Sequence, residues 1–265
     1  MIDSLGLWTA HEANLRLRGL SACTVDQRRR VIGNLTATID AADITGADVN
    51  AFLASKPNQK TRSVYRTHIV TFYRWCYAEG LLPADPTGRV PKILTRRGVP
   101  RPIADDGFLV ALEAASDANL HLWLLLGYDA GLRCMEIAGL RRENIYRDHL
   151  IVLGKGDKER TVPFTPRLAA VLAEWDTGGV GWVFRGRKGG HVAASSVSTL
   201  LARHLHACGV AATGHRLRHS FASRVYRESQ DIRLTQELLG HASLASTQVY
   251  AAADMTKAAA VMAAI

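Results

Sequence analysis

The sequence predicts a mainly α-helical protein with a small β-hairpin or sheet, divided into a helical N-terminal domain and a larger α+β C-terminal domain. Three observations predict this. Apolar residues recur at helical spacing over most of the 265 residues. One stretch, 149–164, instead has strand-like segments on both sides of the tight turn GKGDKE. Five of the eight prolines cluster in 81–102, where helical periodicity is interrupted, and this indicates a linker.

The first domain, 1–88, is expected to be a bundle of four helices. The apolar stripes place these helices at about 3–18, 21–39, 45–53 and 58–79. Ser21 is a favourable N-cap residue, Thr45 or Asp48 is expected to start the third helix, and Gly80 stands in the position preferred after a helix C-terminus. Four helices of this size can form an independent bundle.

Basic residues are concentrated between residues 56 and 101. This stretch holds ten Lys and Arg but only two acidic residues, so it carries nearly the whole formal net charge of +9. A solvated helix face normally mixes both signs, and the excess therefore predicts a surface for the phosphates of a polyanionic partner. The segment 89–104 is both basic and rich in proline, and is expected to be an extended linker. The candidates for contacts to phosphate are Lys60, Arg62, Arg66, Arg96 and Arg97.

The second domain, 105–265, is expected to combine helices with the hairpin. Asp105 or Asp106 is expected to cap its first helix, and a very apolar helix follows within 121–131. A short helix is expected in LRCMEIAGL. The strand-like segments are 149–153, 160–164 and, as a third strand, 180–184. The remainder is expected to be helical, at about 194–207, 215–227 and 231–239, with two short helices to the C-terminus.

The composition excludes several classes of protein. No apolar run approaches the roughly 20 residues that a membrane span requires. The amphipathic start MIDSLGLWTAHEANLRLRGL carries acidic residues and does not have the pattern of a signal peptide. We therefore expect a cytoplasmic protein. The four cysteines form no C-x-x-C pair, which argues against a disulfide framework and against a zinc ribbon.

Two short motifs carry charged residues that are suited to chemistry, and each also has a plain structural interpretation. Arg133 and Glu136 are three residues apart, so on a helix they share one face and can form an ion pair. Lys155 lies in the glycine-flanked hairpin turn, where it either donates a proton in a groove or remains a solvated charge.

Two further motifs lie near the C-terminus. His215 and Arg218 are neighbours on one predicted helix, where they suit a phosphate group or form part of a generic basic surface. His241 follows a glycine and precedes Tyr250 by nine residues; alone, a tyrosine is most often a packing residue. Taken together and in this order, these residue types predict charge-stabilised attack on a phosphodiester by a tyrosine hydroxyl.

The chain resembles the tyrosine recombinase, or phage integrase, family over nearly its whole length. AGLRCMEIAGL resembles the family's first arginine motif, LGKGDKERTVPF its lysine hairpin, GHRLRHSFAS its H-x-L-R-H box, and LLGHASLASTQVY the segment that ends at the nucleophile. The resemblance implies that 1–88 is a core-type DNA-binding domain and that 105–265 is an integrase-type catalytic domain. It also implies a simple recombinase without a separate arm-binding domain, which acts on double-stranded DNA core sites.

The resemblance further implies a role for each chemical residue at the scissile phosphate. Tyr250 would be the nucleophile of a 3′-phosphotyrosyl link, Arg133 and Arg218 the clamps on the non-bridging oxygens, Lys155 the proton donor to the leaving 5′-oxygen, His215 the acceptor of the tyrosine proton, His241 a hydrogen-bond donor to the phosphate, and Glu136 a supporting residue. Because the protein–DNA ester stores the bond energy, neither a metal nor another cofactor is expected.

The family's commonest role is the integration and excision of a phage or other mobile element, including viral genome integration. The resemblance implies a synaptic tetramer on DNA, to which Asp254–Ile265 would contribute by packing on a neighbouring subunit, and accessory proteins that bend DNA or control direction. The alternatives are a type IB topoisomerase that relaxes DNA and a catalytically silent DNA-binding regulator of the same fold. A metal-dependent nuclease is less favoured, because the sequence offers no clear carboxylate cluster.

Overall fold

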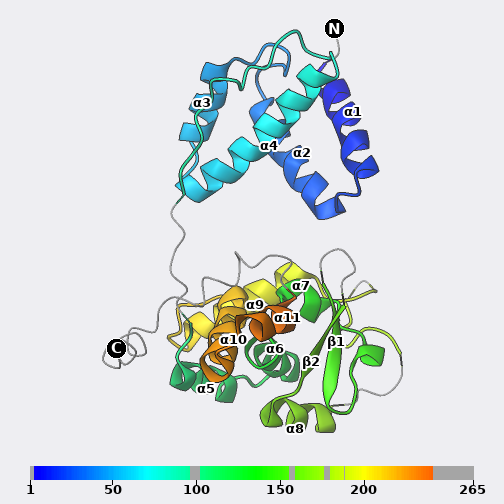
Figure 1. Cartoon of the computed structure of the whole chain (residues 1–265), viewed down its shortest axis with the longest axis vertical. Coiled ribbons are helices and arrows are strands. Elements are labelled where there is room, and N and C mark those ends of the chain that lie inside the picture. The colour runs from blue at the N-terminus through cyan, green and yellow to red at the C-terminus, as the bar shows by residue number, and fades with distance from the viewer. Residues whose placement is uncertain (1–2, 96–101, 155–158, 176–179, 188, 241–265) are drawn as a thin grey trace, which may run out of the picture. The chain divides into compact units, whose positions relative to one another are not determined.

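The computed structural model describes residues 3–95, 102–154, 159–175, 180–187 and 189–240 (Figure 1). Its internal contacts divide the chain into two compact units, Met1–Gly98 and Val99–Ile265. The division falls inside the segment 89–104, for which the sequence predicts a linker; the bounds of that linker stay a prediction.

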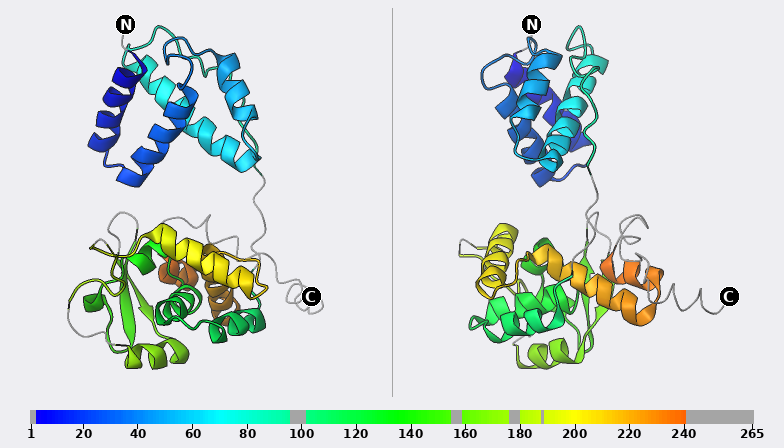
Figure 2. Two further views of the ribbon diagram at one scale, coloured as in Figure 1. Left: turned by 180° about the vertical axis from the view of Figure 1, so that it is seen from behind. Right: turned by 90° about the vertical axis from the view of Figure 1, so that its left-hand side faces the viewer.

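The first unit is a bundle of four helices (Figures 1 and 2). They are α1 (Ser4–Leu17), α2 (Ala22–Leu35), α3 (Gly46–Ala54) and α4 (Gln59–Ala78). The long helix α4 contacts each of the other three. It contributes Ile69, Phe72 and Tyr73, all fully buried, to the core of this unit, and the Tyr73 hydroxyl donates to the carbonyl of Ala41 at 3.1 Å.

Each helix of this bundle begins at a side chain that accepts a hydrogen bond from a backbone N–H of the first turn. The four capping residues are Asp3, Ser21, Thr45 and Asn58. At Thr45 the cap is reciprocal, because the Asp48 carboxylate accepts in turn from the backbone N–H of Thr45 at 2.9 Å. These caps satisfy N–H groups that have no partner within a helix, so they set where the helices start.

Two of the basic residues in the first unit bind its own backbone. Arg66 donates from Nε to the carbonyl of Pro91 at 2.6 Å and from Nη2 to that of Val90 at 2.7 Å. Arg62 donates from Nε to the carbonyl of Lys56 at 2.8 Å. Since Val90 is itself buried, Arg66 holds the chain around residue 90 against the bundle.

The second unit packs its helices around one apolar helix, α6 (Ala118–Tyr128), which contacts α5, α7, α8, α9 and α10. The other elements of this unit are α5 (Asp105–Glu113), α7 (Cys134–Ala138), the 3₁₀ helix η1 (Arg142–Asn144), β1 (His149–Leu153), β2 (Glu159–Pro163), α8 (Pro166–Glu174), α9 (Ala194–Ala207), α10 (Gly214–Ser229) and α11 (Ile232–Leu239). A helix that is apolar on all sides must be surrounded, and every residue of α6 from Leu122 to Tyr128 is buried.

The predicted hairpin is present. Strand β1 pairs antiparallel with β2 in a register that places Val152 opposite Arg160 and Leu150 opposite Val162. Burial alternates along both strands, as expected of a sheet with one face on the core. The mainly helical fold class with a small antiparallel sheet is therefore confirmed.

Three details of the prediction were wrong. The described sheet has two strands, and in 180–184 only Trp182 forms an isolated bridge, to Arg141. The first helix of the second unit is preceded by Ala104, so Asp105 and Asp106 occupy its first turn and do not cap it. Helix α8, which the prediction lacked, is capped by Thr165 and has Pro166 as its first residue.

None of the helices in the described part of the chain is both long and apolar enough to cross a membrane.

The turn after α6 depends on Gly131, and a substitution there is expected to destabilise the second unit. Gly131 has φ +64°, and an added Cβ would lie 2.4 Å from Cδ1 of Phe221. Gly131→Ala therefore combines the left-handed backbone cost of about 1–2 kcal/mol with an overpacking cost of about 1–3 kcal/mol. Gly209→Ala is the matched control, because Gly209 has φ +76° but open space around its Cβ position. The free energy of unfolding, measured by urea titration, should fall clearly further in Gly131→Ala than in Gly209→Ala, and amide exchange in α6 should rise more. Equal losses of stability would contradict the packing argument.

Candidate active site

Four elements of the second unit that are distant in sequence meet at one place. The N-terminal end of α7 carries Arg133 and Glu136, β2 carries Arg160, and α10 carries His215 and Arg218 near its start. Helix α11 packs against both β2 and α10. Figure 1 shows α11 between α10 and the hairpin.

The carboxylate of Glu136 is the centre of this arrangement. It accepts from Arg133 Nη1 at 2.6 Å and from the Arg133 backbone N–H at 2.9 Å. Arg160 binds both of its oxygens, with Nη1 at 3.0 Å from Oε1 and Nη2 at 2.7 Å from Oε2. Arg218 Nη1 lies 3.6 Å from Oε2. One carboxylate thus holds three guanidinium groups, and the predicted Arg133–Glu136 ion pair is present.

Arg160 and Arg218 also hold the last turn of α11. Arg160 Nε donates to the carbonyl of Leu238 at 2.8 Å, and Arg218 Nη2 donates to that of Leu239 at 2.5 Å. These carbonyls belong to the C-terminal turn, which lacks helical partners and bears the negative end of the helix dipole. Gly240 then ends the helix in the left-handed conformation, at φ +61°.

The charges in this cluster do not balance. Three arginines face one carboxylate, so the cluster has an excess of positive charge. Burial acts to raise the pKa of Glu136, but hydrogen bonds and charge from Arg160, with help from Arg133 and Arg218, lower the pKa below its ordinary value. Glu136 is therefore ionised at neutral pH. The side chains of Arg160 and Arg218 are only 5% and 3% exposed, whereas that of Arg133 is 36% exposed, and a cluster of this kind suits an anion such as a phosphate.

Two histidines lie one turn apart at the start of α10. His215 is exposed, and its ring contacts that of His219 edge-on, with centroids 4.5 Å apart. Burial, followed by the charges of His215, Arg218 and Arg216, lowers the pKa of His219 to about 4. His219 is therefore neutral at pH 7, and His215 packs against an uncharged ring.

Several residues that the sequence singles out lie outside the described residues. They are Lys155, His241, Tyr250, Arg96 and Arg97. The chain itself places Lys155 in the connection between β1 and β2, and places His241 directly after Gly240.

Arg160 is a residue of this site that the sequence prediction lacked. The sequence did contain a signal, because Arg160 lies two residues before Val162 and therefore shares its inward face of β2. An arginine at a buried strand position requires partners, and here they lie 24 and 78 residues away along the chain.

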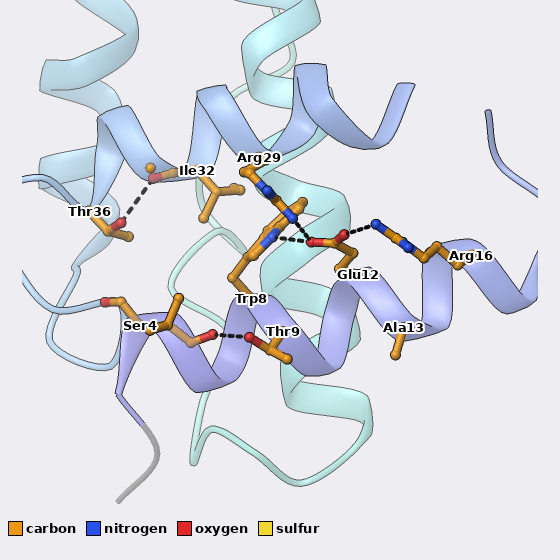
Figure 3. Close-up of a pocket in the computed structure, with 11 residues that line it drawn as sticks. Ser4, Trp8, Thr9, Glu12, Ala13, Arg16, Arg29, Ile32 and Thr36 are labelled. Atoms are coloured by element: carbon orange, nitrogen blue, oxygen red, sulfur yellow. Dashed lines mark hydrogen bonds and ion pairs between the residues drawn. The ribbon is translucent and has the colours of Figure 1, made fainter. Parts of the chain in front are cut away.

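Several grooves of the described residues lie outside this cluster, and two of them are large. One, of about 1040 Å³, is lined in the second unit by basic residues that the prediction also lacked, namely Arg142, Arg185, Arg187, His191 and Arg203. The other, of about 690 Å³, lies between α1 and α2 (Figure 3). There Glu12 accepts from Arg29, from Arg16 Nη2 at 2.6 Å and from Trp8 Nε1 at 2.8 Å, and the Arg29 hydrogen bond above all lowers the pKa of Glu12 to about 2. This second groove contains none of the predicted site residues.

No group of three His, Cys, Asp or Glu side chains that could hold a metal ion occurs among the described residues.

Comparison with known proteins shows to which family the chain belongs. Residues 108–257 match the model of the phage integrase family. The tyrosine recombinase XerC of Xylella fastidiosa (strain M23) is 34% identical over 272 residues, which cover 89% of this chain and 88% of the relative. XerC of Rhodospirillum centenum is 33% identical over 289 residues, covering 96% of this chain and 82% of the relative. A solved lambda integrase dimer, bound to a COC′ core site, has the same fold, with a TM-score of 0.76 at 20% identity over 94% of this chain and 77% of that one.

The chain belongs to the phage integrase family. It is an enzyme of the tyrosine-recombinase class, and its activity is site-specific DNA recombination.

The central role of Glu136 can be tested by the pH dependence of the stability that its carboxylate contributes. Because the folded-state pKa of Glu136 is lowered, its contribution to stability is present above the unfolded pKa of about 4.3 and is lost as pH falls towards the folded pKa. Glu136→Gln is expected to cost about 3–5 kcal/mol at pH 7, because it leaves buried guanidinium groups without their carboxylate.

The measurement is the free energy of unfolding of both proteins by urea between pH 7 and pH 3. The gap between them should shrink below about pH 4. Glu228→Gln is the control, because Glu228 pairs with Arg227 at the surface, with 73% of its side chain exposed, and its loss should change little. A difference in stability that does not change with pH would contradict the role of Glu136 as the ionised centre of the cluster.

Proposed function

We propose that this recombinase cleaves DNA with Tyr250 and that Arg133, Lys155, His215, Arg218 and His241 surround the scissile phosphate, with Glu136 in support. The observation that carries the proposal is the positive cluster around Glu136, at which the first arginine motif, the H-x-L-R-H box and the helix preceding His241 converge. An excess of guanidinium charge is what a phosphodiester needs as negative charge grows on its oxygens.

The proposed step conserves atoms and charge. The Tyr250 oxygen attacks phosphorus and passes its proton to His215, while the bond from phosphorus to the 5′-oxygen breaks. The electron pair stays on that oxygen, which takes a proton from Lys155. A 3′-phosphotyrosyl ester and a free 5′-hydroxyl result, and the hydroxyl of a partner strand reverses the step to reseal the DNA. Because a tyrosine hydroxyl has an ordinary pKa of about 10, it needs both a base and a positive surrounding.

Within this step the two arginines have different surroundings. Arg133 is the more exposed, and its side chain binds Glu136 through a single nitrogen, which supports its proposed contact with the phosphate. Arg218 is buried and bridges the carbonyls of Gly131 and Leu239. We propose that both clamp the non-bridging oxygens, Arg133 from the solvent side and Arg218 from within the protein.

The proposed partners are double-stranded core sites and further copies of this chain. The basic residues of the first unit, of which Lys60 is exposed, would contact phosphates, and the basic groove of the second unit is a further candidate for phosphate contacts. One solved neighbour, at 19% identity and a TM-score of 0.74, is a lambda integrase tetramer bound to a Holliday junction. For this chain we propose a synaptic tetramer, accessory DNA-bending or directionality proteins, and a location in the cytoplasm with the nucleoid DNA.

The proposed task is the integration and excision of a phage or other mobile element, and the match to the phage integrase family supports it. A core site beside the protein's own gene would support this task. A core site that is found only far from the gene would contradict it.

Tyr250→Phe is expected to abolish covalent attachment to DNA. The test mixes the protein, in EDTA, with nicked duplexes tiled from the DNA that flanks its gene, and detects adducts that resist SDS. The unaltered protein should form an adduct on one fragment, because the reaction requires no metal. Tyr146→Phe is the matched control, since Tyr146 is an exposed tyrosine of the same unit, and it should keep the adduct. An adduct that survives in Tyr250→Phe would rule out the nucleophile.

DNA binding is expected to weaken steeply with salt. On B-DNA each phosphate contact adds about 0.9 to the slope of log K against log salt concentration, so Lys60→Gln should lower that slope by about 0.9. Arg16→Gln removes a charge that is also exposed but lies outside the basic stretch, and it should leave the slope unchanged. Fluorescence anisotropy on a labelled duplex at several salt concentrations measures both. A flat salt dependence of the unaltered protein would contradict a phosphate-binding role for the basic stretch.

A further inference from the structure

We propose that Arg160 is a positioning residue of the recombination reaction. It joins β2, the second strand of the lysine hairpin, to Glu136 and to the end of α11, and so fixes the point at which the chain towards His241 leaves that helix. The proposal rests on the proposed function, because it takes the cluster around Glu136 as the phosphate site.

The geometry of Arg160 connects three segments through one side chain. Its two Nη atoms bind the two oxygens of Glu136 at 3.0 and 2.7 Å, and its Nε binds the carbonyl of Leu238 at 2.8 Å. The residue itself belongs to β2, five positions after Lys155. The side chain is only 5% exposed, so water cannot readily replace these hydrogen bonds.

The end of α11 also packs directly on this side chain. A Cβ added at Gly240 would lie 3.0 Å from Cδ of Arg160 and 3.3 Å from its Nη1. Gly240 adopts φ +61° and is the last described residue before His241. The position of Arg160 therefore determines where the chain turns away from the helix, one residue before a predicted site residue.

This arrangement requires the planar fork of arginine. Two parallel donors match the two carboxylate oxygens, and the third nitrogen of the same plane reaches the carbonyl. A lysine at this position keeps the charge but has a single nitrogen, and cannot satisfy Glu136 and Leu238 in the same geometry.

Arg160 also affects the charge that remains for DNA. Arg160 binds both oxygens of Glu136 from the buried side, so Arg133 and Arg218 do not have to neutralise the carboxylate alone. Without Arg160 the carboxylate would bind these two arginines more strongly, and would cancel part of the positive charge that a phosphate needs. Loss of Arg160 is therefore expected to slow bond breakage strongly and to change the affinity for DNA little.

The test compares four full-length proteins: unaltered, Arg160→Met, Arg160→Lys and Arg167→Met. Arg167 is the matched control, because it makes a two-nitrogen pair with the buried Asp129 of the same unit, at 2.9 and 2.8 Å, away from Glu136. The measurements are amide exchange at Gly240, the binding midpoint on the nicked core-site duplex, and the single-turnover rate of adduct formation at saturating protein.

Both Arg160 variants should lose about 10–100-fold in the rate of adduct formation, as supporting residues of a site commonly do. Their binding midpoints should stay close to that of the unaltered protein, and exchange at Gly240 should rise. Arg167→Met should lose stability but keep the rate and the exchange at Gly240. Arg160→Lys keeps the buried charge, so it provides the comparison if Arg160→Met fails to fold.

Unaltered exchange at Gly240 in the Arg160 variants would overturn the proposal. So would an Arg160→Lys protein that cleaves at the full rate, or an Arg167→Met protein that is slowed as much as Arg160→Met. If the unaltered protein forms no adduct, the proposed function fails instead, and exchange at Gly240, which needs no DNA, still decides whether Arg160 fixes the end of α11.

Discussion

The buried carboxylate of Glu136 is the interaction on which the site depends. Three arginines from three elements converge on it, and each is fixed by a different part of the fold: Arg133 by the start of α7, Arg160 by β2 and Arg218 by α10. Guanidinium groups this close repel one another without a counter-charge. Glu136 therefore permits a dense cluster of positive charge, and the cluster retains an excess that suits a phosphate.

The same arginines connect this charge to the path of the chain. The carbonyls of Leu238 and Leu239 receive hydrogen bonds from Arg160 and Arg218, so the cluster also fixes the end of α11. Gly240 then turns the backbone against the Arg160 side chain. A recombinase needs its nucleophile to meet the phosphate at a defined place. In the proposed function, the same arginines support both the phosphate site and the start of the segment that leads to Tyr250.

Much of the fold could be predicted, because its signals are local. Helix α9 matches its predicted range, and Ser21 and Thr45 cap helices as their residue types indicate. What was missed depends on contacts between distant segments. The inward position of Arg160 could be inferred from the strand pattern, but its partners Glu136 and Leu238 come from distant segments. The expected strand at 180–184 lacks a partner strand in the described sheet. The roles of Lys155, His241 and Tyr250 rest on their motifs and stay predictions.

The central claim is that Tyr250 becomes joined to DNA, and mass spectrometry tests it most directly. The adduct formed on a nicked core-site duplex would be digested with nuclease and trypsin, and the modified residue would be located by fragmentation. Cleavage after Arg233 and Lys257 gives a peptide in which Tyr250 is the only tyrosine. A nucleotide remnant on Tyr250 is the predicted result. A remnant on any other residue, such as Tyr226 of α10, would contradict the account.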